Sequence, residues 1–420
     1  MSDFFQTGVA TTLHYLAAHD GERFVRELAD PGARPVQLVL PCLLDDFRSP
    51  AMETILAQLP GARYLYRTIL VLGGAEERDY LDALRRINRA SPGLHDVLWL
   101  ESPRIRKILA ELEELGLVLI NSGKGRAVWL GLGLANADDR ESAIVAHDCD
   151  IKTYERTLLD RLAYPVAIPQ LGYDYAKGYY ARVAGRLYGR VSRLFLTPLL
   201  RSLIRLVGPH PFLIFMDSFR YPLSGEFAMQ SKLARLVRIP GDWGLEVGML
   251  AEMYRLCAPS GVCDVEVLQG HFDHKHQAPG GPSSSTGLKR MAVEIAQTLF
   301  RTLAVESVSL DDGTLRTLRV AYMRLAQDYI RRYADDSIMD GLEYDRHVEG
   351  SLVDLFTHAL GEAIARFQAD PLAAAYLPNW NRVISATPTV LDQLREAVDQ
   401  DAKEAREKLS RRRRKPRQPA

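Results

Sequence analysis

Residues 142–154 read SAIVAHDCDIKTY, and this stretch joins a short apolar run to an acidic pair. The run at 142–145 predicts a buried strand, and Asp148 and Asp150 follow it with Cys149 between them. Two carboxylates at a strand end can hold a hard cation such as Mg²⁺ or Mn²⁺, which completes its shell with water and phosphate oxygens. A solvated turn is the more common meaning of an isolated D-x-D, so the surrounding sequence has to decide between the two.

Strands and helices alternate on both sides of this stretch. The hydrophobic periodicity predicts strands at 36–40 (stopped by Pro41), 66–72, 97–100 and 142–145, and helices at 49–59, 76–89, 105–115 and 126–136. Further along, it predicts strands at 164–168, 212–216 and 265–268, helices at 186–207 and 243–256, and mostly helix from 288 to about 409. This alternation is typical of an α/β sheet with helices on both faces, whose ligands bind beyond the carboxyl ends of the strands.

The composition excludes several classes of protein. The 420 residues include 53 basic and 53 acidic side chains, so the net charge gives no steering toward nucleic acid or an anionic membrane. The four cysteines show no C-x-x-C spacing, which argues against a disulfide scaffold or a zinc ribbon. The sequence shows neither a signal peptide nor an apolar run of about 18 residues. We therefore expect a soluble, cytoplasmic protein whose partners are small molecules rather than nucleic acid.

A second group of candidate ligands follows the predicted strand at 265–268. His271, Asp273, His274 and His276 fall within six residues, in a chain that contains ten histidines. Histidine is a common ligand of transition metals, so the group favours a metal site near the end of this strand. A polar loop with a single buried histidine is the alternative.

Two glycine-containing segments suit anionic groups. In NSGKGRAVWLGL (121–132), two glycines flank Lys124 in front of a predicted helix, and a helix N-terminus with a lysine favours anions, although the spacing is not that of a P-loop. In YGRVSRLFLTPLL (188–200), Arg190 and Ser192 precede an apolar helix, which suits a phosphate or a carboxylate. Solvated side chains in an ordinary helical turn are the alternative for the second segment.

Two more segments, SGEFAM (224–229) and PGDWGLEVGML (240–250), place carboxylates next to glycines. Glu246 can hydrogen-bond sugar hydroxyls from a helix; a partly buried carboxylate paired with an arginine is the alternative.

The motifs occur in a specific order: a first strand ending in Pro, G-K-G, D-x-D, G-R-V-[ST], G-E-[FY]-A, G-x-E-x-G-[ML]-L, and a strand followed by H-[KR]. Over residues 36–277 the chain thereby resembles the retaining GT-A glycosyltransferases of family 81, the glucosyl-3-phosphoglycerate synthases.

The resemblance implies a GT-A type nucleotide-diphospho-sugar transferase fold, in which helices flank a mixed sheet, with a mainly helical C-terminal extension. It implies Mg²⁺- or Mn²⁺-dependent transfer of a hexose, expected to be glucose from UDP-glucose, to 3-phosphoglycerate. The implied roles are metal binding by Asp150 and His274, catalysis by Asp150 and Glu246, nucleotide binding by Pro41, Leu43, Asp45, Lys124 and Asp148, and acceptor binding by Arg190, Val191, Ser192 and Glu246.

The resemblance also suggests how the chain is divided. We expect an N-terminal helical lead-in (1–34), a nucleotide-sugar-binding α/β half (35–160), an acceptor-binding half (161–287), a helical C-terminal region (288–409) and a disordered basic tail (410–420). The segment QAPGGPSSSTG (277–287) has the composition of a linker. The C-terminal helices are expected to form a lid or a dimerisation element, and we expect a homodimer.

Departures from the family pattern leave the donor open. Gly73-Gly74-Ala75-Glu76 replaces an acidic or serine-rich loop, and Leu44-Asp45 stands where the first-strand motif usually carries Glu after Asn. GDP-mannose, GDP-glucose or ADP-glucose therefore remain as donors, and glycerate as an acceptor. Two other classes of protein also remain: a non-catalytic nucleotide-binding scaffold and a metal-dependent phosphohydrolase. The phosphohydrolase would need acidic ligands at further strand ends, and glycines occupy one such end.

Overall fold

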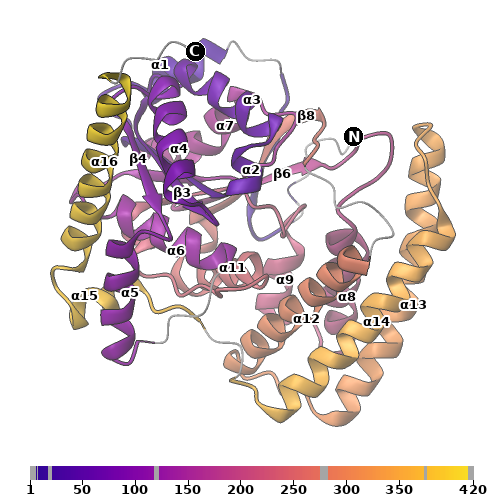
Figure 1. Cartoon of the computed structure of the whole chain (residues 1–420). Helices are drawn as coiled ribbons and strands as arrows, with labels where there is room; N and C mark the ends of the chain where they lie inside the picture. The colour runs from indigo at the N-terminus through magenta and orange to yellow at the C-terminus, as the bar shows by residue number, and fades with distance from the viewer. Residues whose placement is uncertain are drawn as a thin grey trace.

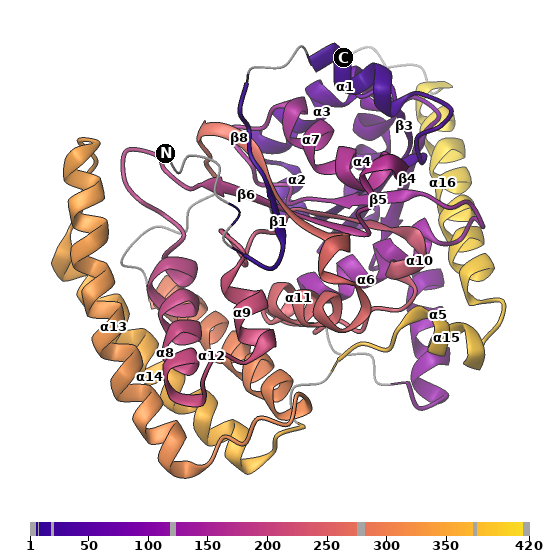
Figure 2. The same cartoon turned by 180° about the vertical axis from the view of Figure 1, so that it is seen from behind.

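The computed structural model describes residues 6, 8–17, 21–117, 123–274, 282–372 and 376–414. Within them, eight strands form one sheet in the order β1-β8-β6-β7-β5-β2-β3-β4 (Figures 1 and 2). The strands are β1 (Thr11–Leu13), β2 (Val36–Leu43), β3 (Leu65–Gly73), β4 (His95–Trp99), β5 (Ala143–Ala146), β6 (Tyr175–Ala181), β7 (Phe227–Gln230) and β8 (Val262–His271). Only β7 among these runs antiparallel to its neighbours, so the sheet is mixed.

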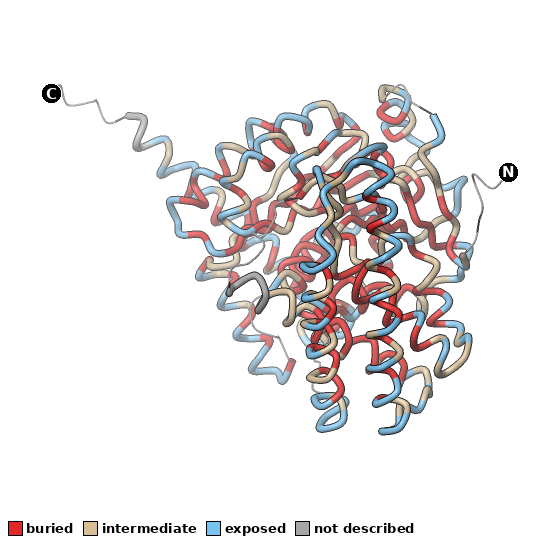
Figure 3. The backbone as a smooth tube through the Cα atoms, turned by 90° about the vertical axis from the view of Figure 1, so that its right-hand side faces the viewer, coloured by how far each residue is buried: buried red, intermediate tan, exposed pale blue. Residues whose placement is uncertain are grey.

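Helices cover both faces of the sheet, as the alternation predicted. One face carries α1 (Gly21–Leu28), α3 (Pro50–Gln58), α4 (Glu77–Ala90) and α7 (Arg156–Ala167), and the other carries α5 (Pro103–Glu114), α6 (Lys124–Ala135) and α11 (Leu245–Leu256). Alternate residues of β2 supply the two cores, because side chains of a strand point to opposite faces: Leu38 and Leu40 lie in one core and Val39 in the other. Figure 3 shows the resulting buried centre.

The C-terminal region is helical, as predicted, and it contacts two separate parts of the molecule. Helices α12 (Pro282–Val305), α13 (Asp312–Met339) and α14 (Arg346–Ala369) pack with α8 (Thr197–Val207) into a bundle at one end (Figure 1). Helices α15 (Trp380–Ala386) and α16 (Val390–Arg414) return to pack on α5, α6 and β4. Stacked indoles of Trp129 and Trp380, whose centroids are 4.2 Å apart, anchor this return. Since α16 reaches Arg414, the predicted disordered tail begins as a helix, and 415–420 lie outside the described residues.

Shorter helices complete the structure. They are α2 (Leu44–Phe47), α9 (Pro211–Asp217), α10 (Ser231–Ala234), the π-helix η3 (Val191–Leu196) and the 3₁₀ turns η1 (Leu59–Gly61), η2 (Pro169–Leu171) and η4 (Pro259–Gly261). The helix predicted at 186–207 therefore begins at Val191 and opens as a π-helix. Among the described residues, no helix has the length and apolar character needed to cross a membrane.

Two of the predicted strands are wrong. Residues 164–168 lie at the end of α7, and residues 212–216 lie inside α9. A short apolar run that is buried on all sides looks the same in a helix and in a strand, so periodicity cannot separate them. The missed signal for α9 is Pro211 at its first position, with His210 Nδ1 accepting a hydrogen bond from Phe212 N. The periodicity also missed three real strands, β1, β6 and β7.

Three segment boundaries also need correction. The lead-in at 1–34 is not wholly helical, because β1 pairs with β8 at the edge of the sheet. Pro41 does not stop β2, which continues to Leu43; pairing with β5 ends at Val39, so the missing N–H of Pro41 costs no bond on that side. The predicted linker is wrong from Pro282 onward, where α12 begins, and 277–281 lie outside the described residues.

Candidate active site

The chain segments that follow β5 and β8 meet beyond the carboxyl ends of these two strands, although β7 and β6 lie between them in the sheet. Asp148 and Asp150 follow β5, and His274 follows β8. A backbone bridge between Ile151 and His274 holds the two segments together. His274 Nδ1 lies 3.0 Å from Asp150 Oδ1, and ligand atoms of Asp148, Asp150 and His274 all lie within 4.8 Å of one another. The fold thus brings together the acidic pair and one histidine of the second predicted group.

This cluster fits a divalent cation. Carboxylates suit both Mg²⁺ and Mn²⁺, and imidazole is a common ligand of transition metals. Burial would raise the pKa of Asp148, but the Lys124 ammonium and His274 outweigh this effect and hold that pKa below its ordinary value. Gly225 leaves room for the carboxylate, since a Cβ there would lie 2.5 Å from Asp148 Oδ2. Asp148 is therefore ionised at neutral pH and fixed beside the two other candidate ligands.

Lys124 connects the acidic pair to Glu246. Its Nζ lies 2.7 Å from Asp148 Oδ1 and 3.1 Å from Glu246 Oε1. Glycine lets the two segments touch, because a Cβ on Gly125 would lie 2.0 Å from the carbonyl oxygen of Pro240. Burial would lower the pKa of Lys124, but the two carboxylates raise it well above its ordinary value. Glu246 is thus a buried helical carboxylate that pairs with a lysine rather than with an arginine.

The site contains two residues to which the sequence motifs assigned no role. Tyr180 Oη donates a hydrogen bond to Glu226 Oε2 (2.7 Å) and lies 3.1 Å from His274 Nε2. Burial, together with the charge of Asp148, raises the pKa of Glu226. A glutamate that enters an apolar strand in SGEFAM was a usable signal for Glu226. Tyr180 gave no signal, because its strand β6 was not predicted.

A buried lysine fixes the loop that carries Glu226. Lys177 Nζ donates to the carbonyl oxygen of Ser224 (2.6 Å), Ser224 Oγ donates to the carbonyl oxygen of Gly178 (2.6 Å), and Gly178 N donates to that of Glu226 (2.9 Å). Burial lowers the pKa of Lys177 to about 8, against the opposing effect of nearby carboxylates. These three bonds hold the loop to β6 and fix its position beside the acidic pair.

The predicted acceptor segment at the start of η3 contacts the C-terminal region. Arg190 Nε lies 2.9 Å from Glu349 Oε1, and Arg193 pairs with the other oxygen of Glu349. Glu349 lies in α14, and its side chain is 4% exposed. Val191 and Ser192 are buried within η3, and Ser192 Oγ has no hydrogen-bond partner among the described residues. The two arginines are therefore neither solvated nor free of a counter-charge, and α14 supplies that charge.

Tyr221 links this segment to the candidate metal-binding cluster. Its ring lies 5.1 Å from that of Tyr180, measured between centroids. On its other side it contacts the backbone before Arg190, because a Cβ on Gly189 would lie 3.3 Å from the Tyr221 ring. Gly189 has φ of +68°, a conformation that favours glycine. A single aromatic ring therefore separates the start of the acceptor segment from Tyr180.

The predicted nucleobase-side residues lie at the carboxyl end of β2. Pro41 is half-buried, whereas Leu43 and Asp45 are exposed. Since β2 runs parallel to β5, this end of β2 lies at the same edge of the sheet as the acidic pair. Nearby, the Gly74 amide after β3 donates to Glu101 Oε1 (2.9 Å). This placement is compatible with nucleotide contacts, and the roles of these three residues stay predictions.

The second predicted ligand group is only partly assembled around the cluster. His274 belongs to it, but Asp273 turns to Lys152, with 3.2 Å between Asp273 Oδ2 and Lys152 Nζ. The side chain of His271, and the whole of His276, lie outside the described residues. Of the four ligands predicted in this group, only His274 lies in the cluster among the described residues.

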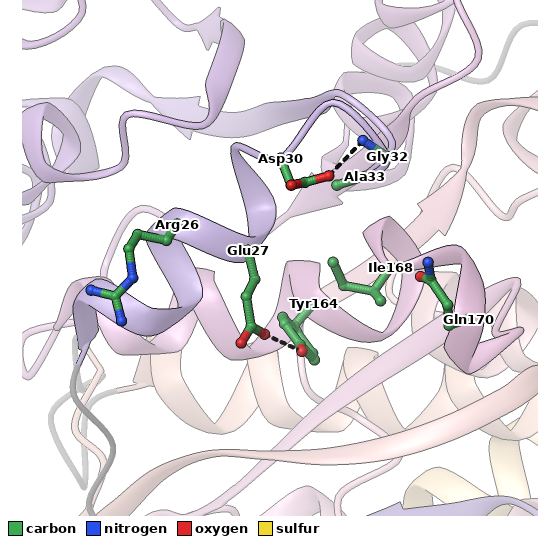
Figure 4. Close-up of a pocket in the computed structure, with 8 residues that line it drawn as sticks. All are labelled: Arg26, Glu27, Asp30, Gly32, Ala33, Tyr164, Ile168 and Gln170. Carbon is green, nitrogen blue, oxygen red and sulfur yellow. Dashed lines mark hydrogen bonds between the residues drawn. The ribbon is translucent and has the colours of Figure 1, made fainter.

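A separate pocket of about 400 Å³ lies at the other end of β2 (Figure 4). Its lining includes Glu27 and Tyr164, whose side chains hydrogen-bond to each other, and Asp30, which accepts from the Gly32 amide (2.8 Å). It precedes β2, whereas Asp148 follows β5, so the two places lie at opposite ends of the parallel strands. The polar groups named here already bond to one another, and the pocket has no evident part in the chemistry of the site.

Comparison with known proteins supports one family. No protein-family model matches the chain. The chain is 42% identical over 402 residues to glucosyl-3-phosphoglycerate synthase of Persephonella marina, covering 96% of this chain and 99% of the relative. It is 36% identical over 412 residues to the protein of the same name from Methanococcoides burtonii, covering 97% of this chain and the whole relative.

Solved structures support the fold. Two crystal structures of glucosyl-3-phosphoglycerate synthase from Mycobacterium tuberculosis are similar at 21% identity. The complex with phosphoglyceric acid has a TM-score of 0.51 over 73% of this chain and 90% of that one. The complex with Mn²⁺, UDP-glucose and phosphoglyceric acid has a TM-score of 0.50 over 70% and 87%. The predicted GT-A fold is thereby confirmed, and the near full-length identity to the two relatives places this chain in the glucosyl-3-phosphoglycerate synthase family.

Proposed function

We propose that this chain transfers glucose from UDP-glucose to 3-phosphoglycerate, with retention at the anomeric carbon and with Mn²⁺ or Mg²⁺ as cofactor. The observation that carries the proposal is the Asp148–Asp150–His274 cluster, in a chain 42% identical to a glucosyl-3-phosphoglycerate synthase over nearly its whole length. The solved relative from Mycobacterium tuberculosis binds Mn²⁺, UDP-glucose and phosphoglyceric acid together. A divalent cation held by Asp148, Asp150 and His274 would offset the charge that develops on the departing diphosphate.

The other side chains of the site have tasks that follow from their contacts. Lys124 places an ammonium between Asp148 and Glu246, where it can attract phosphate oxygens of the donor. Glu246 is held by that lysine, and a paired carboxylate is better suited to orient sugar hydroxyls than to attack carbon. In this scheme the leaving phosphate takes the acceptor proton, so that no enzyme nucleophile is needed. Pro41, Leu43 and Asp45 would line the nucleobase side.

Acceptor binding is assigned to Arg190 and its neighbours. Arg190 is 15% exposed and Glu349 offsets its charge together with that of Arg193. Two guanidinium groups around one carboxylate leave a net positive charge, which favours an anion such as a phosphate ester. Ser192 contributes a buried hydroxyl without a partner among the described residues. We therefore favour 3-phosphoglycerate over glycerate, which lacks the phosphate.

Two assignments concern the whole protein. We propose a homodimer in the cytoplasm, in which the C-terminal helices supply contacts between subunits. Exposed apolar side chains at the end of α13, Ile338 and Met339, favour such contacts. We also propose the division of the chain into nucleotide-sugar-binding, acceptor-binding and C-terminal helical parts, with the expected boundaries at 160 and 287 moved to the starts of α7 and α12, because both lie inside these helices.

The test is product formation from a panel of donors and acceptors. Purified protein is incubated with UDP-, GDP- or ADP-glucose or GDP-mannose and with 3-phosphoglycerate or glycerate, with and without Mn²⁺ or Mg²⁺. We expect metal-dependent glucosyl-3-phosphoglycerate from UDP-glucose. Release of free phosphate would favour a phosphohydrolase, and metal-independent nucleotide binding without any product would favour a scaffold. Product formed from another donor would support a glycosyltransferase that uses a different nucleotide-sugar.

A further inference from the structure

Behind the metal-binding cluster, three side chains form a continuous chain of contacts. His274 Nδ1 faces Asp150 Oδ1 at 3.0 Å, and His274 Nε2 faces Tyr180 Oη at 3.1 Å. Tyr180 Oη in turn donates to Glu226 Oε2 at 2.7 Å. Both Tyr180 and Glu226 are buried, at 7% and 0% exposed. Neither residue lies among the three candidate ligands, so their contact with His274 needs its own explanation.

Counting hydrogen atoms gives that explanation. A tyrosine hydroxyl has one hydrogen, and Tyr180 donates it to Glu226 Oε2. The oxygen of Tyr180 can then only accept from His274, so Nε2 carries a proton, and in a neutral imidazole Nδ1 carries the lone pair. The Nδ1 lone pair faces the Asp150 carboxylate across 3.0 Å. These two acceptors repel each other unless a proton or a metal cation lies between them.

We propose that Tyr180 and Glu226 form a positioning relay that fixes the metal-binding tautomer of His274. The relay keeps the proton on Nε2 and directs Nδ1 toward Asp150, so Nδ1 is the nitrogen available to a divalent cation. It also makes His274 a stronger ligand, because a histidine that donates its second N–H has a more basic free nitrogen. This inference rests on the proposed metal-dependent function and adds two residues to it.

The surroundings make Tyr180 suitable for this task. Its ring stacks on Phe272, with centroids 3.6 Å apart and planes 17° apart, which restrains the ring and so the position of the hydroxyl oxygen. Glu226 is fixed by the bond between its carbonyl oxygen and Gly178 N. Residues that orient a metal ligand in this way typically change metal affinity by about 10- to 100-fold when they are mutated.

The test is Mn²⁺ affinity, measured by electron paramagnetic resonance of free Mn²⁺ with and without UDP. In Tyr180→Phe the ring and its stacking remain and only the hydroxyl is lost. In Glu226→Gln the size remains, but the amide can donate to Tyr180, which reverses the direction of the relay. We expect each variant to bind Mn²⁺ about tenfold more weakly. The double variant should bind Mn²⁺ no more weakly than either single variant, because both substitutions break the same chain of hydrogen bonds.

The adjacent tyrosine provides a matched control. Tyr179 Oη lies 3.4 Å from Glu266 Oε2 on a neighbouring strand, so Tyr179→Phe also removes a strand hydroxyl that faces a carboxylate. It should leave the Mn²⁺ affinity within about twofold of the wild-type value. A second readout is the ¹⁵N spectrum of histidine-labelled, metal-free protein at a pH where His274 is neutral, in which Tyr180→Phe should change the tautomer of His274.

The outcomes separate this inference from the proposed function. If the wild-type protein binds Mn²⁺ and Tyr180→Phe binds it equally well, the relay is rejected and the metal site stands. Additive losses in the double variant would also reject the relay, because they would mean two independent effects. If the wild-type protein binds no Mn²⁺, with or without UDP, both the metal site and the relay are rejected.

Discussion

Two charged clusters of this molecule are built in opposite ways. Around the acidic pair, Asp148, Asp150 and Glu246 share the Lys124 ammonium and the imidazole of His274, and the carboxylates are in excess. Around Arg190, two guanidinium groups share one glutamate. The first cluster is short of positive charge and the second is short of negative charge. Each therefore leaves room for the charge that its proposed ligand would bring, a divalent cation in one and a phosphate ester in the other.

The clusters also differ in how they are assembled. The acidic pair comes from one loop of the sheet, and its partners come from segments fixed by glycine contacts and backbone bonds. The arginines come from η3, but their counter-charge comes from α14, more than one hundred residues later. Substitutions in the first cluster should therefore affect chemistry, whereas substitutions in the second should affect acceptor affinity and also the stability of the bundle.

The largest effect is expected from Asp150→Ala. Loss of one carboxylate ligand should lower kcat/KM about a thousandfold, or ~4 kcal/mol of transition-state stabilisation, and weaken Mn²⁺ binding. Steady-state kinetics at saturating Mn²⁺ check this. Asp139→Ala, which removes an exposed carboxylate in the loop before β5, is the control and should retain activity. Full activity of Asp150→Ala would remove the first cluster from the mechanism.

The next effect is expected from Glu349→Gln. This change leaves two buried guanidinium groups without an ionised partner, which should lower the free energy of unfolding by about 3 kcal/mol. Urea denaturation monitored by circular dichroism measures the change. Glu343→Gln is the matched control, because Glu343 pairs with Arg186 at the surface and should contribute less than about 1 kcal/mol. Equal effects of the two variants would contradict the idea that the second cluster supports the fold.

A steric change should break the first cluster without removing a charge. In Gly225→Ala the new Cβ would lie 2.5 Å from Asp148 Oδ2, so the carboxylate or the loop must move by about 1 Å. We expect a loss of about a hundredfold in kcat, because a shift of this size misplaces the reacting groups. Gly350→Ala, where no atom lies within 4 Å of the new Cβ, is the control. Unchanged kinetics of Gly225→Ala would show that Asp148 tolerates displacement.

The smallest effect is expected from Arg190→Ala, and it should concern binding of the acceptor and not of the donor. Arg190→Ala should raise KM for 3-phosphoglycerate about tenfold, since one charge-assisted contact is lost, and should leave KM for UDP-glucose unchanged. Initial-rate kinetics with each substrate varied in turn separate the two. Arg186→Ala removes a surface arginine from the preceding segment and serves as the control. A rise in KM for the donor alone would reject the acceptor assignment of this cluster.

The sequence predicted the α/β sheet and the acidic pair at a strand end correctly, because these depend on local patterns, whereas the GT-A fold was implied by the family resemblance. Val39 and its neighbours in β2 form a continuous buried run whose side chains alternate between the two cores, and Asp148 follows the equally buried β5. The predictions failed where burial hides periodicity. The apolar runs at 164–168 and 212–216 are helical, and the missing strand β6 concealed Tyr180.

Sequence by itself determined which chemical groups are available: two aspartates one residue apart, a histidine after a later strand, a lysine between glycines and a pair of arginines before a helix. Only the tertiary structure decided how their charges are balanced. It placed Lys124 between Asp148 and Glu246, and it brought Glu349 to the arginines. The physical reason is that electrostatic pairing depends on distances of a few ångströms between residues that are far apart in the chain, and packing alone sets those distances.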